Sequence, residues 1–174
     1  FYGAFDIAPQ YLVVWYLFQT DAELEIAKSS GYCDELKKAT ISNLIDYNFE
    51  HMEKALYVLE SGDIRTQEDL RKQLGDIKTI LSLKRFALVD EDNIVYTQYT
   101  TYSGGSRYEF LSSDKLDKRV IYTTNQYGSS KQLCLAIPTD GLTVMNKKFK
   151  ACFVLIDIEE IADLLAFEEY GGAY

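Results

Sequence analysis

The spacing of the apolar residues changes once along this 174-residue chain, close to residue 85. Between residues 34 and 60 the apolar positions recur at steps of three to five, which keeps them on one face of a helix. These positions are Leu36, Ile41, Leu44, Ile45, Phe49, Met52, Leu56 and Leu59. After residue 85, short apolar runs are separated by polar turns, a pattern typical of strands. Helices followed by grouped strands predict an α+β fold with an antiparallel sheet.

The first part of the chain is expected to be helical, with a long helical segment over residues 1–62 and a second helix over residues 66–83. Residues 29–31, Ser-Ser-Gly, predict a kink in the long segment. Gly62 suits the C-terminal cap of the first segment, and Thr66 suits the N-cap of the second.

The sheet is expected within residues 84–158, with about five strands. They are predicted at residues 86–89, 94–96, 119–124, 133–137 and 151–158, with polar turns at 90–93, 125–130 and 139–148 and a loop with a short helix after residue 103. A last helix is expected over residues 159–168. No repeat or linker divides the chain, so residues 1–174 are expected to form a single domain.

The chain is acidic, with 18 Lys and Arg against 27 Asp and Glu and a formal net charge of −9. An acidic chain repels phosphate, which argues against nucleic acid and anionic membranes as partners. The longest apolar run, residues 11–18, is too short for a membrane-spanning helix, which needs about 20 residues.

No enzyme site is recognisable in the sequence. His51 is the single histidine and lies within the predicted long helix, where we expect it to be a surface or half-buried helix residue and not a metal ligand. No Gly-x-Ser-x-Gly motif and no phosphate-binding glycine signature occur. Residues 90–93, Asp-Glu-Asp-Asn, lack the glycine and glutamate spacing of a calcium loop and predict a hairpin turn. We therefore expect no catalytic residue, no metal and no cofactor.

The three cysteines, Cys33, Cys134 and Cys152, lack the spacing of a metal site and cannot all pair within the chain. Buried free thiols are the favoured interpretation, because cysteine is among the most buried residue types. A bridge between Cys134 and Cys152, on two late strands, is the alternative.

Tyrosine is enriched between residues 96 and 127. Six of the fourteen tyrosines lie there: Tyr96, Tyr99, Tyr102, Tyr108, Tyr122 and Tyr127. Arg107 stands among them, and Arg119 is close in sequence. An arginine surrounded by tyrosine hydroxyls can hold a small carboxylate, while a nearby acid can hold an amine. A sheet with half-exposed tyrosines is the other interpretation, since strands favour aromatic residues.

Four segments resemble a known family, the Cache sensor domains, which are extracytoplasmic PAS-like modules of bacterial receptors. Residues 86–95 (FALVDEDNIV) resemble its first strand pair, and residues 107–110 (RYEF) its arginine-aromatic segment. Residues 133–138 (LCLAIP) and 151–158 (ACFVLIDI) resemble its central and last strands. The resemblance implies a long N-terminal helix packed on a PAS-like antiparallel sheet.

The family also implies a ligand site. Arg107 matches the arginine of its amino-acid-binding members, Asp157 matches the acid on their last strand, and Tyr122 matches an aromatic residue on the middle strand. Tyr96, Tyr108 and Tyr127 complete the candidate ligand-binding residues. Two positions depart from the family pattern, because Thr124 stands where an acid is usual and Glu109 where an aromatic residue is usual.

These observations predict a non-enzymatic, ligand-binding sensor domain of a bacterial transmembrane signalling protein, lying on the extracytoplasmic side. Its ligand would be a small polar molecule, such as an amino acid or a carboxylate, and the long helix would carry the signal. The stripe Ile41, Ile45, Met52, Leu56 and Leu59 can pack on the sheet or pair with a second copy in a homodimer. The family implies an output domain such as a diguanylate cyclase or histidine kinase outside this chain. The alternative is a PAS-like structural or dimerisation module without a ligand.

Overall fold

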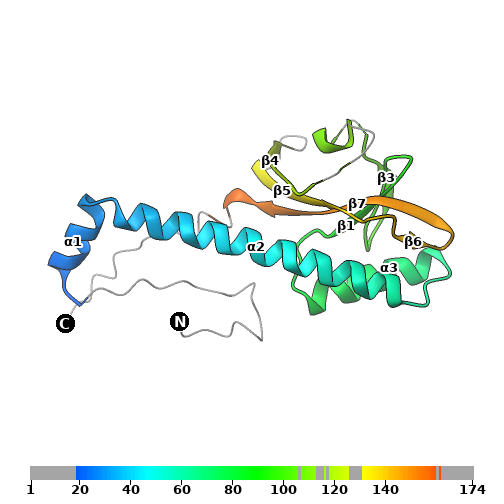
Figure 1. Cartoon of the computed structure of the whole chain (residues 1–174), viewed down its shortest axis with the longest axis horizontal. Helices are drawn as coiled ribbons and strands as arrows, with labels where there is room; N and C mark the ends of the chain where they lie inside the picture. The colour runs from blue at the N-terminus through cyan, green and yellow to red at the C-terminus, as the bar shows by residue number, and fades with distance from the viewer. Residues whose placement is uncertain are drawn as a thin grey trace.

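Three helices precede seven strands, which confirms the α+β class (Figure 1). The computed structural model describes residues 19–105, 107–112, 116, 118–125, 131–159 and 161. The helices are α1 (Asp21–Ser29), α2 (Tyr32–Ser61) and α3 (Gln67–Ile80), and a 3-10 helix, η2, covers Glu109–Ser112. The strands are β1 (Ala87–Asp90), β2 (Ile94–Tyr96), β3 (Thr101–Ser103), β4 (Val120–Asn125), β5 (Lys131–Pro138), β6 (Thr143–Val144) and β7 (Lys147–Asp157).

The predicted kink lies at Gly31, between α1 and α2. Gly31 has a φ of 81°, a left-handed conformation that glycine adopts without steric cost and that redirects the chain. At the other end of α2, Gly62 is the C-cap, and its backbone N–H donates to the carbonyl of Leu59. Both helix boundaries predicted from small residues are therefore confirmed.

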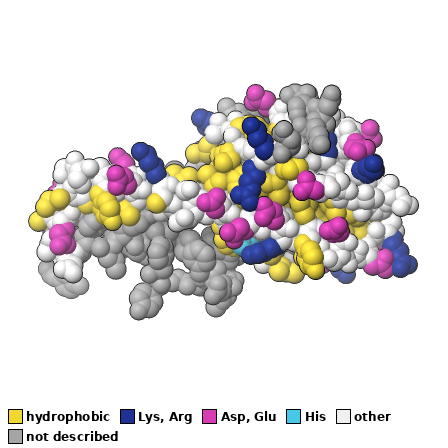
Figure 2. Space-filling model, in the orientation of Figure 1, with side chains coloured by type: hydrophobic (Ala, Val, Ile, Leu, Met, Phe, Trp, Pro, Cys, Tyr) yellow, Lys and Arg dark blue, Asp and Glu magenta, His cyan; other side chains and the backbone are white. Residues whose placement is uncertain are grey.

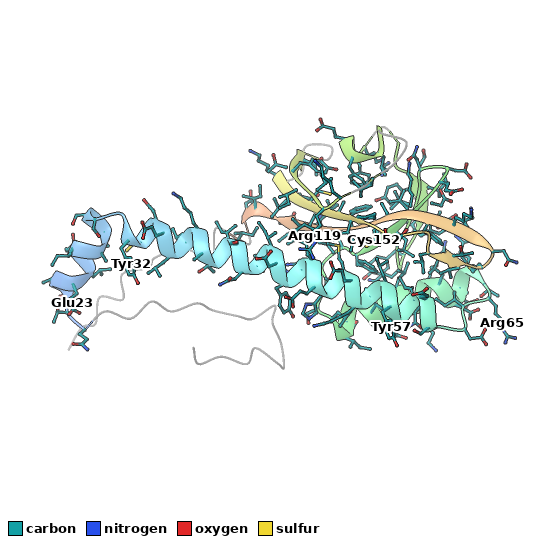
Figure 3. All side chains as sticks on the ribbon, viewed as in Figure 1. Glu23, Tyr32, Tyr57, Arg65, Arg119 and Cys152 are labelled. Atoms are coloured by element: carbon teal, nitrogen blue, oxygen red, sulfur yellow. The ribbon has the colours of Figure 1, made fainter. Side chains whose placement is uncertain are left out.

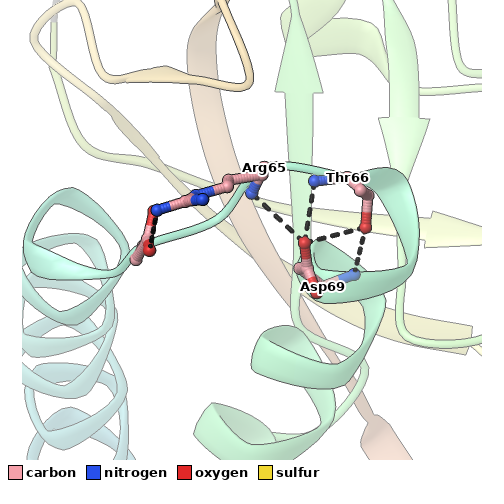
Figure 4. Close-up of polar contacts among 4 residues, drawn as sticks. Arg65, Thr66 and Asp69 are labelled. Atoms are coloured by element: carbon pink, nitrogen blue, oxygen red, sulfur yellow. Dashed lines mark hydrogen bonds and ion pairs between the residues drawn. The ribbon is translucent and has the colours of Figure 1, made fainter.

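The start of α3 is fixed by a capping box. The hydroxyl of Thr66 accepts from the backbone N–H of Asp69, and the Asp69 carboxylate accepts from the backbone N–H of Thr66 (Figure 4). These bonds satisfy N–H groups that a helix start otherwise leaves unpaired. They also hold the pKa of Asp69 below its ordinary value.

All strand pairs of the sheet are antiparallel, in the order β3-β2-β1-β7-β5-β4, and β6 pairs with β7. Strands β5 and β7 form the longest pair, from Gln132 opposite Asp157 to Pro138 opposite Ala151. This arrangement puts the last strand in the middle of the sheet and β4 at one edge.

The prediction of a polar turn at residues 139–148 is wrong. That segment contains β6 and the start of β7, joined by a tight turn at Met145 and Asn146, which have φ values of 54° and 57°. Val144 and Phe149 of this hairpin are buried. Short β3 was also missed, so the sheet has seven strands where about five were expected.

Each face of the sheet has its own apolar cluster. On the helix-covered face, Phe49, Met52 and Leu59 of α2 and Leu70, Leu74 and Ile77 of α3 pack against residues such as Leu135 and Val154. The expected stripe on α2 belongs to this cluster, with Met52 and Leu59 fully buried and Ile41, Ile45 and Leu56 partly buried. On the loop-covered face, residues between 102 and 116 pack on β4, β5 and β7.

Several predicted segments fall outside the described residues: the helical stretch before residue 19, the turn at 126–130 and the helix after residue 161. Ile158, Glu159 and Ile161 are helical, so a helix follows β7 directly. Among the helices of the described residues, none combines the length and apolarity that crossing a membrane requires.

Candidate functional site

An aromatic layer covers the loop-covered face of the sheet. Tyr108, which is 1% exposed, lies with its ring centroid 4.6 Å from that of Phe153 on β7. Phe110 lies 5.6 Å from Phe153 and 6.1 Å from Tyr122 on β4. The short helix η2 thus places Phe110 over the middle of the sheet, next to the candidate residue Tyr122.

Two buried polar atoms on this face have no hydrogen-bond partner: Oη of Tyr122 and Oε1 of Gln132. The strand register puts Tyr122 opposite Cys134, and Gln132 lies two residues before Cys134 on the same face. Burial, together with a weak contact to the neighbouring Cys134 thiol that falls short of a hydrogen bond, raises the pKa of Tyr122, so its hydroxyl stays protonated. Burial also raises the pKa of Cys134, to about 12. Unpaired buried polar groups are rare and costly, and they mark places where a ligand can supply the missing bond.

Asp157 lies beside these two groups, because the register pairs it with Gln132. Its Oδ1 accepts from Gln132 Nε2 at 2.7 Å, and its Oδ2 accepts from Arg85 Nη2 at 3.0 Å. The carboxylate therefore has a charged partner already. We name Tyr122, Gln132 and Asp157 the polar patch.

Gln132 and Arg85 were not among the sequence-derived candidates. The alternation of β5 places Gln132 on the same face as Cys134 and Ala136, a signal that was available in the sequence. Nothing local points to Arg85, which reaches Asp157 across 72 positions of sequence.

Arg107 and Tyr108 belong to the other end of the aromatic layer. The exposed guanidinium of Arg107 lies 4.7 Å from the ring centroid of Tyr102 on β3. The hydroxyls of Tyr102 and Tyr108 are hydrogen-bonded at 2.7 Å. Because β3 and β4 are at opposite edges of the sheet, Arg107 and the polar patch are joined through Tyr108, Phe110 and Phe153.

Tyr96 is not part of this group, because it lies on the helix-covered face. Its hydroxyl donates to Oδ2 of buried Asp90 at 3.0 Å, and its ring meets Phe149 edge-on. Lys147 donates to the same Oδ2, and the Tyr96 hydroxyl together with the Asp90 carboxylate raises the pKa of Lys147. The remaining candidate, Tyr127, lies outside the described residues.

The turn at residues 90–93 is a hairpin, as predicted. Oδ1 of Asp90 accepts from the backbone N–H groups of Asp92 and Ile94, so this carboxylate holds the turn. His51 Nδ1 lies 2.8 Å from the carbonyl of Tyr47, one turn earlier on α2. Across the described residues, no group of three or more histidine, cysteine or acidic side chains is arranged to hold a metal ion.

The alternative of a bridge between Cys134 and Cys152 is wrong. All three cysteines are free and buried. Cys134 belongs to the cluster on the loop-covered face and Cys152 to the cluster on the helix-covered face. Their side chains therefore point to opposite sides of one sheet and cannot meet.

On the helix side, an open groove of about 760 Å³ lies between α2 and the end of β5. It is lined by Glu53, Tyr57 and Glu60 of α2, by Lys118 and Arg119, and by residues 137–143. In Figure 2 hydrophobic side chains form a strip between α2 and the sheet, with charged side chains along its borders. Arg119, close to Arg107 in sequence, therefore lies on the other side of the sheet from the aromatic layer.

No family model matches the chain, and no curated protein matches it in sequence. Among solved structures, it is similar to the sensory domain of the Campylobacter jejuni chemoreceptor Tlp3 (CcmL), which was crystallised with isoleucine bound. The TM-score is 0.53 and the identity is 10%, over 82% of this chain and 64% of the other. The chain thus spans less than two thirds of that sensory domain. The likeness shows a shared fold, in agreement with the PAS-like α+β architecture.

Proposed function

We propose that this chain is an extracytoplasmic ligand-binding sensor domain of a bacterial signalling protein, and that the whole of it forms one module. The observation that carries the proposal is the polar patch, where two buried polar atoms lack partners beneath the aromatic layer. A ligand that accepts from Tyr122 Oη and donates to Gln132 Oε1 would remove the free-energy cost of leaving these two buried groups without a hydrogen bond. The sensory-domain fold supports the same role.

The proposed ligand is a small polar molecule with both a donor and an acceptor, as in an amino acid. Gln132 Oε1 offers an acceptor, Tyr122 Oη offers a donor, and Asp157 adds negative charge beside them. Because Asp157 is already paired with Arg85, an incoming amine would share this carboxylate with the guanidinium. Arg107, at the other end of the aromatic layer, is proposed to attract a ligand carboxylate.

Signalling is proposed to run through α2, which packs into the cluster on the helix-covered face from Ile41 to Leu59. A ligand shifts the packing of this helix only if it binds one arrangement more tightly than the other. The output domain that receives the signal, and the membrane anchor, are proposed to belong to the full-length protein.

A thermal-shift screen with amino acids, carboxylates, polyamines and nucleosides tests the proposal. A compound that binds the native state at one hundred times its Kd stabilises the protein by about 2.7 kcal/mol and so raises Tm. Tyr122→Phe should abolish the shift of the best compound. Tyr99→Phe is the matched control, because Tyr99 is 76% exposed and remote from the patch.

If no compound raises Tm at millimolar concentration, the ligand-binding proposal is abandoned. If a compound raises Tm equally in the Tyr122→Phe variant, the site is elsewhere. For any compound that raises Tm, a smaller shift in the Arg107→Ala variant would show that the ligand reaches across the aromatic layer to Arg107.

A dimerisation module without a small ligand is the second candidate. It is favoured by exposed apolar side chains away from the sheet: Ile26 on α1 is 65% exposed and Tyr32 at the start of α2 is 50% exposed. Sedimentation of the protein at several concentrations measures the oligomeric state. A dimer that Ile26→Asp dissociates, together with a blank ligand screen, would favour this candidate.

A further inference from the structure

Strand β4 presents side chains to both faces of the sheet. Val120 and Tyr122 pack on the loop-covered face, where Tyr122 belongs to the polar patch. Because strand side chains alternate, Arg119 and Ile121 belong to the opposite side. Within the described part of the sheet, β4 is an edge strand that pairs with β5 alone. An edge strand held on one side moves more easily than a central one.

Arg119 connects this edge strand to α2. Its Nη2 donates to Oε1 of Glu53 at 2.6 Å, and its guanidinium carbon lies 4.9 Å from the ring centroid of Phe49. Glu53 and Phe49 are one helical turn apart on α2, so a single side chain contacts two successive turns. Phe49 is 2% exposed and belongs to the core, so Arg119 is in contact with a firmly packed part of the helix.

The open groove lies between α2 and the end of β5, next to the segment that leads into β4. Arg119 and Glu53 both line it, and Ile121, on the same side of β4, is 51% exposed. Figure 3 shows Arg119 between α2 and the strands. The Arg119–Glu53 pair therefore joins the segment before β4 to α2 beside open space.

We propose that Arg119 couples the position of β4 to the position of α2. A displacement of Tyr122 on the loop-covered face moves β4, and Arg119, three residues earlier, transfers that movement to α2 through Glu53 and Phe49. The use of this coupling for signalling rests on the proposed function, but the coupling itself exists without a ligand. An exposed ion pair adds little stability, so the test of this coupling measures local exchange and not overall stability.

Hydrogen exchange of the α2 amides tests the coupling in the ligand-free chain. Phe110→Leu disturbs the packing beside Tyr122 without touching α2. In the wild-type background, this change should raise the exchange of amides at residues 49–56 by about three-fold or more, relative to the α3 amides, which report global opening. In the Arg119→Gln background, Phe110→Leu should leave the ratio of the α2 exchange rates to the α3 exchange rates unaltered.

In a Glu53→Gln background, Phe110→Leu should likewise leave the α2 exchange rates unaltered relative to α3, because this change removes the charged partner of Arg119. Arg65→Gln is the matched control, since Arg65 also forms an exposed pair, with Asp63, in the segment before α3. The proposal is overturned if Phe110→Leu changes the ratio equally with and without Arg119, or if it changes nothing in the wild-type background. A blank ligand screen would leave both results unaffected, so the two proposals fail separately.

Discussion

Two tyrosine hydroxyls under the same aromatic layer differ in their hydrogen bonds. The hydroxyl of Tyr102 is bonded to that of Tyr108, whereas the hydroxyl of Tyr122 has no hydrogen bond and only a weak contact to the Cys134 thiol. Tyr102→Phe should destabilise the protein by about 0.5–1.5 kcal/mol, because it removes the hydrogen bond to the buried Tyr108 hydroxyl. Tyr122→Phe should be neutral or stabilising, because it removes an unpaired polar group. Urea unfolding of the two variants measures the difference.

Equal losses in the two variants would contradict this expectation. They would mean that the Tyr122 hydroxyl has a partner in solution, such as a bound water. Tyr99→Phe again serves as the reference for deleting an exposed hydroxyl.

Asp69 predicts how the stability of α3 depends on pH. Hydrogen bonds from the Thr66 side chain and backbone lower the pKa of Asp69 in the folded protein. A carboxylate whose pKa is lowered by folding stabilises the folded state. This stabilisation is fully present at pH values above the pKa in the unfolded chain, about 3.9, and is lost as the pH falls through the pKa in the folded protein. The stability difference between the wild type and Asp69→Asn should therefore shrink as the pH falls below about 4.

Urea unfolding from pH 7 to pH 2.5, followed by circular dichroism, measures this difference. Thr66→Ala removes the bonds to the hydroxyl, so the pH dependence should be weaker in that background. A difference that stays constant across the acid range would show that Asp69 is not ionised in the capping box.

Site residues could be predicted from the sequence only in part. The alternation of a strand shows that Ile94 and Tyr96 share a face, but which face it is depends on where the helices pack. Tyr96 was therefore grouped with Tyr108 and Tyr122, although it lies on the other side of the sheet. The Asp157–Arg85 pair joins distant parts of the chain and has no local signal.

At the scale of elements, the segment that covers the aromatic face depends on Gly104. A Cβ atom there would lie 2.5 Å from Cγ2 of Val95 and 3.1 Å from Cδ1 of Leu111. Gly104→Ala should therefore destabilise the protein by about 1–3 kcal/mol, because neither buried neighbour can move freely. Gly105→Ala is the matched control, with its nearest atom 3.7 Å away, and should change stability by less than about 0.5 kcal/mol.

Thermal unfolding of both variants measures the contrast. A Gly104→Ala variant as stable as Gly105→Ala would show that the segment after β3 is not packed against Val95 in solution. Tyr108 would then lose its place in the aromatic layer.

Elements with strong local signals were predicted well, and elements stabilised by pairing were not. Gly31, Gly62 and Thr66 mark helix boundaries through backbone conformation and capping, which depend on a few neighbouring residues. Strand β6 has only two residues, and it exists because Val144 is buried against the helices when it pairs with β7. Ile80, the last residue of α3, is 78% exposed.

At the scale of the whole molecule, the two-faced core predicts how the thiols react. Cys33, Cys134 and Cys152 are all buried, and burial raises the pKa of both Cys134 and Cys152. Thiolate is the reactive form, so an aromatic disulfide reagent at pH 8 should modify the native protein much more slowly than the unfolded protein. All three thiols should react promptly in denaturant.

The reaction is followed by the absorbance of the aromatic thiolate that the reagent releases. Unfolding midpoints with and without a reducing agent should agree, because Cys134 and Cys152 cannot form a bridge. A midpoint that falls on reduction would contradict the two-faced arrangement of the sheet.

The architecture itself followed from the switch in apolar spacing near residue 85, which separates the helices from the sheet. The order of the strands did not follow from it, because β7 pairs not only with nearby β5 but also with β1, which lies about 60 residues earlier in the chain. That order is what places β4 at an edge and Arg119 next to α2.

The length of α2 has a mechanical consequence. Its N-terminal part, before Ile41, extends past the sheet toward α1 (Figure 1). Tyr32 lies 21 residues before Glu53, which is about 30 Å at 1.5 Å per residue. A tilt of α2 about the Arg119 contact would therefore move the start of the helix further than the contact itself. A tilt of about 5° at that contact would carry the helix start through about 2.6 Å, an amplification that a short helix packed along its whole length could not give.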